Sequence, residues 1–180
     1  MAHKDWKSIV DSSWTLFLDR DGVINQRIID GYVKCCDEFV FLPFVKEAFT
    51  KFSNAFSRII IVSNQQGIGK GLMTADDMSL IHGFMQSEIE KAGGRIDALY
   101  VCPQLSSEPG NYRKPSPKMA FMAKEQYPEI DFSKSVMVGD ARSDIEFGRN
   151  FGAQTILIGS NVDFGADDSF TSLYAFSETL

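Results

Sequence analysis

The chain has 180 residues, of which 44% are hydrophobic and 12% aromatic, a composition typical of one globular domain with a substantial core. Its formal net charge of −6 argues against a nucleic-acid partner, because phosphate backbones are bound chiefly by an excess of Lys and Arg. No apolar run reaches the roughly 18 residues of a membrane span, and the first residues lack a signal-peptide core, so we expect a cytoplasmic protein.

Five short apolar runs have the length and composition of buried strands. They cover residues 14–18, 58–62, 96–101, 135–138 and 154–158. Runs such as "RIIIV" and "SVMV" contain few polar residues, which is typical of strands covered on both faces. Helix-like segments separate most of these runs. The alternation predicts a single three-layer α/β domain over residues 1–180, with a central parallel sheet between two layers of helices.

Helices are predicted between the strands from capping signals and periodicity. Pro43 suits the first turn of a helix that ends near Ala55. Thr74 and Asp77 form a capping signal ahead of a Met-rich apolar stripe. His82 lies in the same helix, away from the motifs described below, and is expected to have a surface or packing role. Further helices are predicted in "SPKMAFMAKEQY" and "SDIEFGRNFG", and a short one in "SFTSLYAF".

Polar side chains follow the predicted strands at the edge where open parallel sheets bind ligands. They are Asp19 and Asp21 after the first strand, Ser63, Asn64 and Gln65 after the second, Arg113 and Lys114 after the third, and Asp140 and Asp144 after the fourth. The acids Asp19, Asp21 and Asp140, with no neighbouring His or Cys, suit Mg²⁺ better than zinc. Lys114 and the Ser63 hydroxyl are suited to phosphate oxygens. The set indicates phosphoryl transfer.

Four ordered motifs, "FLDRDGVIN", "IVSNQQGIGKG", "YRKPSP" and "VMVGDARSDIEFGRNFGA", resemble those of the haloacid dehalogenase (HAD) superfamily of phosphatases. The resemblance extends from about Trp14 to Ile158. More narrowly, "DRDGVIN", "SNQQGIGKGLMT" and "RKPSP" are similar to the heptose bisphosphate phosphatase and histidinol phosphatase subgroup. This implies a Rossmann-like (HAD-like) domain that hydrolyses a small phosphorylated sugar with Mg²⁺. The typical substrate is D-glycero-D-manno-heptose 1,7-bisphosphate, which loses its 7-phosphate.

The same resemblance implies roles for the motif residues. Asp19 is expected to be the nucleophile that forms a phospho-aspartyl intermediate, and Asp21 the acid and base. Ser63 and Lys114 are expected to hold the transferring phosphoryl group. The expected substrate contacts are Asn64, Gln65 and Arg113.

The resemblance also implies a metal site. Mg²⁺ is expected on the Asp19 carboxylate, the Asp21 main-chain carbonyl and Asp140. Asp144 is expected behind them, where it orients Lys114 or a metal-bound water. Such a metal would relieve the repulsion between two aspartates that stand one residue apart.

Zinc is not expected. The heptose and histidinol enzymes usually carry a structural zinc loop of Cys and His before the Arg-Lys-Pro motif. Here the interval reads "YVCPQLSSEPGNYRKP", in which Cys102 is the only possible ligand. A structural zinc site needs about four N or S ligands, so we predict that this chain binds none.

The spacing leaves no room for a separate cap domain. The intervals from Asp19 to Ser63 and from Ser63 to Lys114 are each largely used by one helix and one strand. We therefore expect an open site that is closed by loops such as 26–37 and 104–112. The longer segment 26–42 is predicted to be either a loop or a small hairpin flap over the end of the sheet.

Alternatives remain open at this point. The chain could be a histidinol phosphate phosphatase. It could also be a polynucleotide 3′-phosphatase, because its turn "SNQQGIGKG" is similar to that enzyme, although the acidic net charge disfavours this alternative. A catalytically idle binding or scaffold protein on the same fold is a further alternative, disfavoured by the complete set of motif acids, hydroxyl and lysine. "GIGKG" lacks the pattern of a nucleotide-binding loop, while Lys70 within it is a candidate contact for a distal anionic group of the substrate.

Overall fold

A six-stranded parallel sheet forms the centre of the computed structural model, which describes residues 3–159, 162 and 164–180. The strands are β1 (Thr15–Leu18), β2 (Arg58–Asn64), β3 (Ala98–Cys102), β4 (Ser135–Gly139), β5 (Gln154–Ile158) and β6 (Asp168–Phe170). Their order is β3-β2-β1-β4-β5-β6, so the chain first builds outward from β1 in one direction and then in the other. The crevice beside β1 and β4 is therefore the switch point at which such sheets bind ligands.

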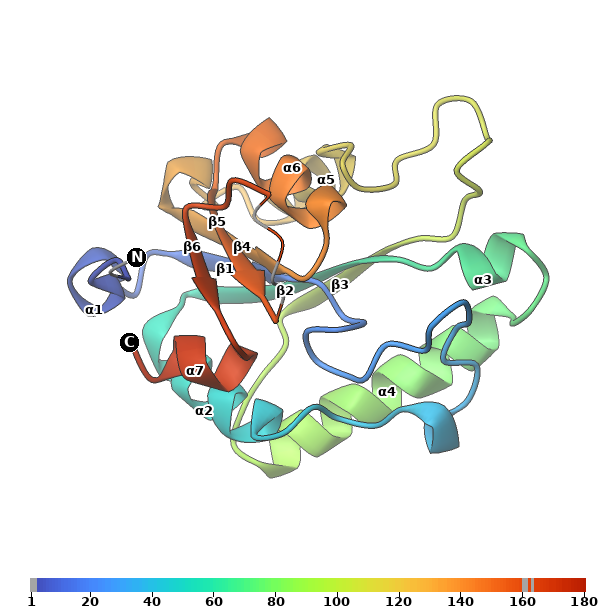
Figure 1. The fold of residues 1–180 in the computed structure, drawn as a ribbon, viewed down its shortest axis with the longest axis horizontal. Coiled ribbons are helices and arrows are strands. Elements are labelled where there is room, and N and C mark those ends of the chain that lie inside the picture. The colour runs from blue at the N-terminus through green and yellow to red at the C-terminus, as the bar shows by residue number, and fades with distance from the viewer. Residues whose placement is uncertain (1–2, 160–161, 163) are drawn as a thin grey trace.

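Helices cover both faces of the sheet (Figure 1). One face carries α2 (Val45–Ala55), α4 (Ala75–Lys91) and α7 (Leu173–Ser177), and the other carries α5 (Lys118–Gln126) and α6 (Arg142–Phe151). The shorter elements are α1 (Trp6–Ile9), α3 (Gln66–Gly69) and the 3₁₀ turns η1 (Cys36–Glu38) and η2 (Phe132–Lys134). Among the described residues no helix is both long and apolar enough to cross a membrane. The predicted three-layer α/β fold is confirmed.

Successive side chains of β1 point to opposite faces of the sheet and pack into two separate hydrophobic clusters. Leu16 and Leu18 pack into the cluster under α2, α4 and α7, whereas Phe17 packs into the cluster with residues of α5 and α6. All three side chains are fully buried. Because both faces of the strand are covered, its sequence reads as a continuous apolar run.

The elements differ from the sequence predictions mainly at their ends. β2 continues through Ser63 and Asn64, because these residues pair with Val101 and Cys102 of β3. No sequence pattern predicts β6, since a three-residue strand that begins with two polar residues has no apolar run. The predicted helix in "SFTSLYAF" is therefore wrong in its first part, and α7 occupies only the second. The capping box at Thr74 is confirmed.

Residues 26–42, here called the flap, form a loop with paired ends. An isolated bridge joins Asn25 to Phe41, and the Gln26 amide donates to the Val40 carbonyl at 2.8 Å. Beyond this neck the flap is irregular apart from η1. It lies beside α4, near the end of β1 (Figure 1). Both predicted forms are thus partly present, because the neck is hairpin-like and the rest is loop.

The interval between β3 and α5 is a projecting loop (Figure 1) held by its own side chains. Glu108 Oε1 accepts the Leu105 amide at 2.8 Å, and Asn111 Nδ2 donates to the Glu108 carbonyl at 2.8 Å. Gln104 Oε1 accepts the Tyr112 amide at 3.2 Å. These bonds define the conformation of the loop just before Arg113 and Lys114 enter the site.

Candidate active site

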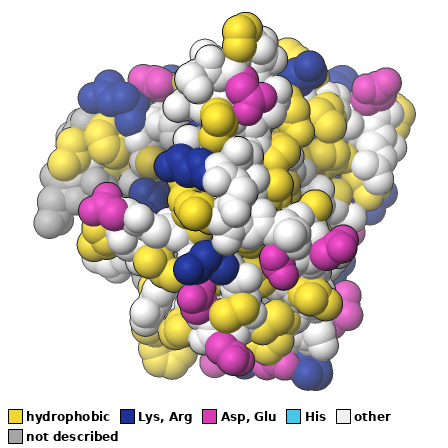
Figure 2. Space-filling view, turned by 90° about the vertical axis from the view of Figure 1, so that its right-hand side faces the viewer, with side chains coloured by type: hydrophobic (Ala, Val, Ile, Leu, Met, Phe, Trp, Pro, Cys, Tyr) yellow, Lys and Arg dark blue, Asp and Glu magenta, His cyan; other side chains and the backbone are white. Residues whose placement is uncertain are grey.

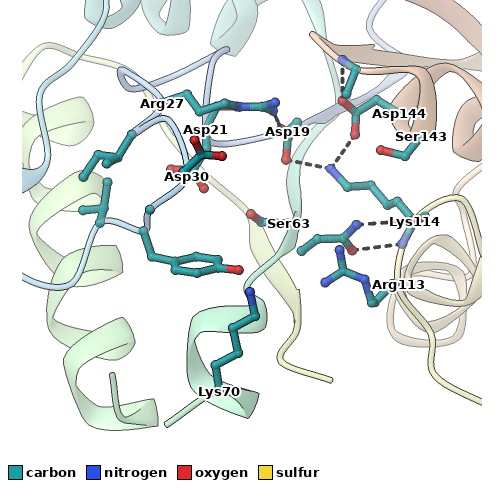
Figure 3. Close-up of a pocket in the computed structure, with 16 residues that line it drawn as sticks. Asp19, Asp21, Arg27, Asp30, Ser63, Lys70, Arg113, Lys114, Ser143 and Asp144 are labelled. Carbon is teal, nitrogen blue, oxygen red and sulfur yellow. Dashed lines mark hydrogen bonds and ion pairs between the residues drawn. The ribbon is translucent and has the colours of Figure 1, made fainter. Parts of the chain in front are cut away.

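A cavity of about 490 Å³ opens at the carboxyl edge of the sheet, beside the switch point. Its wall is built from strand ends, from the loop before α5 and from the flap (Figure 3). The predicted site residues that line it are Asp19, Asp21, Ser63, Asn64, Arg113, Lys114 and Asp144. Two other predicted residues, Gln65 and Asp140, do not form its wall. The chain thus brings most of the motif residues to one place.

Lys114 joins two aspartates at the floor of the cavity. Its Nζ lies 2.6 Å from Asp19 Oδ1 and 2.7 Å from Asp144 Oδ1, and it donates to the Val62 carbonyl at 2.8 Å. Burial favours the neutral amine, but the two carboxylates outweigh it and raise the pKa of Lys114. Asp144 packs against Gly139, where an added Cβ would lie 2.1 Å from the Asp144 Cβ. The glycine that ends β4 therefore makes room for this ion pair.

Asp19 is buried, and burial disfavours the charged form of its carboxylate. Burial raises its pKa to about 6, and the neighbouring charges of Asp144 and Asp21 add to the effect against the attraction of Lys114. Burial together with the charge of Asp19 likewise raises the pKa of Asp140 to about 7. This edge of the sheet therefore holds more negative charge than Lys114 alone compensates.

The acidic cluster fits a hard divalent cation. Asp19, Asp140 and Asp144 each place a carboxylate oxygen within 4.8 Å of the others. Asp140 reaches this cluster over Gly22, which has φ +94° and where a Cβ would lie 2.0 Å from Asp140 Oδ2. The cluster offers only oxygen atoms, which suit Mg²⁺ better than zinc. A bound Mg²⁺ would neutralise the excess negative charge of these carboxylates.

Asp21 is fixed from below by the buried Arg20. Arg20 Nη2 donates to Asp21 Oδ1 at 3.0 Å, and Arg20 Nε donates to Oδ2 at 3.2 Å. Asn25 and Gln65 donate to the same carboxylate at 2.9 and 2.6 Å. Burial raises the pKa of Asp21, but the charge of Arg20 and these hydrogen bonds outweigh it and lower the pKa overall. Arg20 itself faces the core rather than the cavity, as the alternation of β1 predicts.

His82 supports Arg20 from α4. Its Nε2 lies 3.1 Å from Arg20 Nη1, and Met78 Sδ lies 3.0 Å from the same nitrogen. Because a guanidinium can only donate, His82 accepts through Nε2 and is neutral. Burial and the charge of Arg20 lower its pKa to about 4. The expectation that His82 lies away from the motifs is therefore wrong, since α4 passes directly under Arg20.

Gln65 differs from its predicted role. Its side chain is buried, and its Nε2 donates to Asp21 Oδ2 and to Ser63 Oγ, at 2.6 and 2.8 Å. Both amide hydrogens are thus used below the cavity wall, so direct contact between Gln65 and a substrate does not fit this geometry. The short strand-end turn places Gln65 under the site, where it links the hydroxyl to the carboxylate.

Asn64 clamps the main chain of Lys114. Asn64 Oδ1 accepts the Lys114 amide at 2.9 Å, and Asn64 Nδ2 donates to the Lys114 carbonyl at 3.2 Å. Asn64 also lines the cavity. Its side-chain amide therefore positions the lysine that holds Asp19.

Two further basic side chains face the cavity at a distance from Asp19 (Figure 3). Arg113 makes a long contact of 3.5 Å with the Gln104 carbonyl. Lys70 Nζ lies 5.3 Å from the centre of the Tyr32 ring. Both cationic groups are open to a ligand in the cavity.

Arg27 is a site residue that the sequence reasoning missed. It extends from the flap to the strand ends, where its Nη2 lies 2.6 Å from Asp140 Oδ1 and 3.9 Å from Asp19 Oδ2. It also donates to the Asp21 carbonyl, at 3.0 Å from Nη2 and 3.3 Å from Nε. The signal in the sequence was a cationic residue shortly after the aspartate pair, within a segment whose conformation no pattern defined.

Comparison with known proteins agrees with this geometry. The HAD-hydrolase-like family model matches residues 111–172. D-glycero-alpha-D-manno-heptose-1,7-bisphosphate 7-phosphatase of Mycobacterium bovis is 38% identical over 91% of this chain and 90% of its own length. D-glycero-D-manno-heptose-1,7-bisphosphate 7-phosphatase of Chlorobaculum tepidum is 34% identical over 83% and 80%.

A solved structure extends the similarity to three dimensions. The D,D-heptose 1,7-bisphosphate phosphatase of B. bronchiseptica, complexed with magnesium and phosphate, superimposes with a TM-score of 0.84. The match covers 92% of this chain and 96% of that chain at 27% identity. Sequence and fold agree with the acids, lysine and hydroxyl gathered at the switch point. The chain therefore belongs to the HAD-like hydrolases, in the family of the heptose-1,7-bisphosphate 7-phosphatases, and is a phosphatase.

Proposed function

We propose that this phosphatase hydrolyses the 7-phosphate of D-glycero-D-manno-heptose 1,7-bisphosphate, leaving the 1-phosphate, through a phospho-aspartyl intermediate on Asp19. The observation that carries this proposal is a buried Asp19 carboxylate held by Lys114 at 2.6 Å on the floor of a cavity with further cationic groups in its wall. The M. bovis relative is named for the α anomer, which supports the α anomer as the preferred substrate.

In the first step the Asp19 carboxylate attacks phosphorus. An Asp19 O–P bond forms, and the bond from phosphorus to the sugar oxygen breaks while that oxygen takes a proton from Asp21. In the second step water attacks the aspartyl phosphate, Asp21 takes its proton, and inorganic phosphate leaves. Lys114 and Ser63 hold the phosphoryl oxygens throughout, and Asn64 keeps Lys114 in place.

The bonds from Arg20, Asn25 and Gln65 fix the carboxylate of Asp21 in one orientation. They favour its charged form, which is the form that activates water in the second step. Bound phosphate adds negative charge nearby, and this favours the protonated form that the first step needs. The same carboxylate can thus serve both steps.

Asp19, Asp140 and the main-chain carbonyl of Asp21 would hold Mg²⁺, which neutralises charge on the transferring phosphoryl group when it is bound. The acidic cluster supports this, as does the magnesium in the B. bronchiseptica structure. Asp144 has a different part, because its oxygens are used by Lys114 Nζ and by the Ala141 amide. It holds the lysine.

The second phosphate of the substrate would bind to Arg113 and Lys70, which face the cavity away from Asp19. Charge-assisted bonds to a distal phosphate would orient the sugar so that its 7-phosphate reaches Asp19. The flap lies between β1 and β2, the loop before α5 follows β3, and both segments line the cavity. This supports an open, single-domain site that is closed by loops.

Figure 2 shows the molecule from the side on which the carboxyl ends of the strands lie. The Lys and Arg side chains described on this face lie in separate small groups among acidic and apolar ones. A polynucleotide substrate is held by a continuous basic track, so this surface supports a small substrate instead.

A comparison of kcat/KM tests the proposal. The substrates are both anomers of the heptose 1,7-bisphosphate, heptose 7-phosphate, histidinol phosphate and a 3′-phosphorylated oligonucleotide. We expect the α bisphosphate to give the highest value and the monophosphate to lose affinity. A higher kcat/KM for histidinol phosphate or the oligonucleotide would refute the substrate assignment. Absence of turnover with every substrate would favour a scaffold.

A further inference from the structure

Arg27 is placed unlike the other cations of the cavity. Lys70 and Arg113 face open space, and Lys114 lies between two carboxylates on the floor. Arg27 instead extends from the flap toward Asp19 and Asp21 (Figure 3). It contacts the Asp140 carboxylate and the Asp21 carbonyl, and its Nη2 lies 3.9 Å from Asp19 Oδ2. Its side chain is 47% exposed, so it is not locked into the core.

The three oxygens that surround this guanidinium are those we assign to the metal. A divalent cation needs the lone pairs of Asp140 and of the Asp21 carbonyl at roughly 2.1 Å. Arg27 Nη2 already approaches Asp140 Oδ1 to 2.6 Å and the Asp21 carbonyl to 3.0 Å. A guanidinium at these distances competes with the cation for the same oxygens, and the two positive charges also repel each other.

We infer that Arg27 is a displaceable internal counter-ion, which holds the acidic cluster in the metal-free protein and must leave it when Mg²⁺ binds. The inference rests on the Mg²⁺ role in the proposed function. The guanidinium brings a second positive charge to Asp19 and Asp140, beside that of Lys114.

The flap is coupled to this exchange. Arg27 ties the flap directly to the strand ends, and the flap residues Ile28 and Tyr32 line the cavity. When the guanidinium leaves the carboxylates, this tie is released. The displaced Arg27 then faces the cavity, where a phosphate is the anion within its reach. Metal binding thereby releases Arg27 from the carboxylates, so that its guanidinium can contact the substrate.

Calorimetric titration with MgCl₂ alone, without substrate, tests the inference. The proteins are the wild type, Arg27→Met, which keeps the apolar stem, and Arg142→Ala as a charge-matched control. Arg142 is exposed, follows Asp140 by two residues and pairs with Glu146 at 3.8 Å. We expect Arg27→Met to bind Mg²⁺ about tenfold more tightly than the wild type, since a competing ion pair is removed, and Arg142→Ala to match the wild type.

The outcomes separate the two proposals. Equal or weaker binding by Arg27→Met, with a wild type that binds, overturns the counter-ion inference and leaves the function standing. Absence of Mg²⁺ binding in all three proteins overturns the metal role and the inference together. A tenfold gain in both arginine variants would show a general charge effect and would also overturn it.

Thermal unfolding provides a second readout. In EDTA we expect Arg27→Met to melt a few degrees below the wild type, because its acids have lost their counter-ion, and in saturating Mg²⁺ we expect the gap to close. A variant that folds only with Mg²⁺ is the extreme form of the same result. A gap of equal size under both conditions would indicate a structural role for Arg27 and would contradict the inference.

Discussion

His82 should make the protein less stable in mild acid. Its pKa is lowered from 6.5 to about 4 by burial and by the charge of Arg20. Between these values the unfolded chain binds a proton at His82 and the folded chain does not. The free energy of unfolding therefore decreases as the pH falls through this window, because protons favour the state that binds more of them.

The size of the effect follows from the two pKa values. At pH 7 the imidazole is mostly neutral in both states, so His82 contributes almost nothing. At pH 5 the unfolded state is stabilised by proton binding, and the linkage relation gives a loss of about 2 kcal/mol. The raised pKa values of Asp19 and Asp140 have the opposite effect, since they stabilise the folded state as the pH falls over this range. The contribution of His82 must therefore be measured as the difference between the wild type and a variant without this histidine.

The control is His82→Gln, whose side-chain oxygen can still accept from Arg20 Nη1 but does not titrate. Urea unfolding of both proteins at pH 7 and pH 5, in EDTA, gives four free energies. We expect the wild type to lose about 2 kcal/mol more than the variant between the two pH values. Equal losses would show that His82 binds its proton in the folded protein, and would refute its role as a neutral acceptor for Arg20.

Asp19→Asn should abolish turnover with an unchanged circular dichroism spectrum, and residual turnover near the wild-type rate would rule out Asp19 as nucleophile. EDTA should stop activity and Mg²⁺ restore it; full activity in chelated buffer would contradict the metal role. Elemental analysis should find no stoichiometric zinc, since Cys102 has no partner ligands in its loop sequence, and one zinc per chain would overturn this. Gly22→Ala should weaken Mg²⁺ binding at least tenfold in titration calorimetry, because its Cβ would lie 2.0 Å from Asp140 Oδ2 at a positive φ; unchanged affinity would show that Asp140 does not need that space.

Much of the architecture could be predicted because it depends on local sequence patterns, such as apolar runs and helix-capping signals. Buried parallel strands require apolar runs, and the residues after those runs must meet at one edge, which brought Asp19 and Lys114 together without any knowledge of distances. The capping box at Thr74 was equally local. A short polar strand such as β6 has no such pattern. It is held by contacts of Asp168 with the distant Lys4 amide and the Trp6 indole.

The parts of the site that the sequence did not reveal depend on long-range packing. The contact between His82 and Arg20 joins residues 62 positions apart, and it is set by how α4 rotates against the end of β1. Arg27 belongs to an irregular segment whose path is defined by its neck and by contacts across the fold. Gln65 shows the related difficulty that a turn can direct a predicted contact residue below the cavity instead of into it.

A covalent intermediate on Asp19 determines the stereochemical course of the reaction at phosphorus, which can be measured. The substrate carries an isotopically labelled thiophosphoryl group at position 7, so that hydrolysis in labelled water releases chiral thiophosphate. Attack by Asp19 followed by attack of water inverts the configuration at phosphorus twice, so we expect overall retention of configuration. Overall inversion would show that water attacks the substrate directly, and would contradict the mechanism.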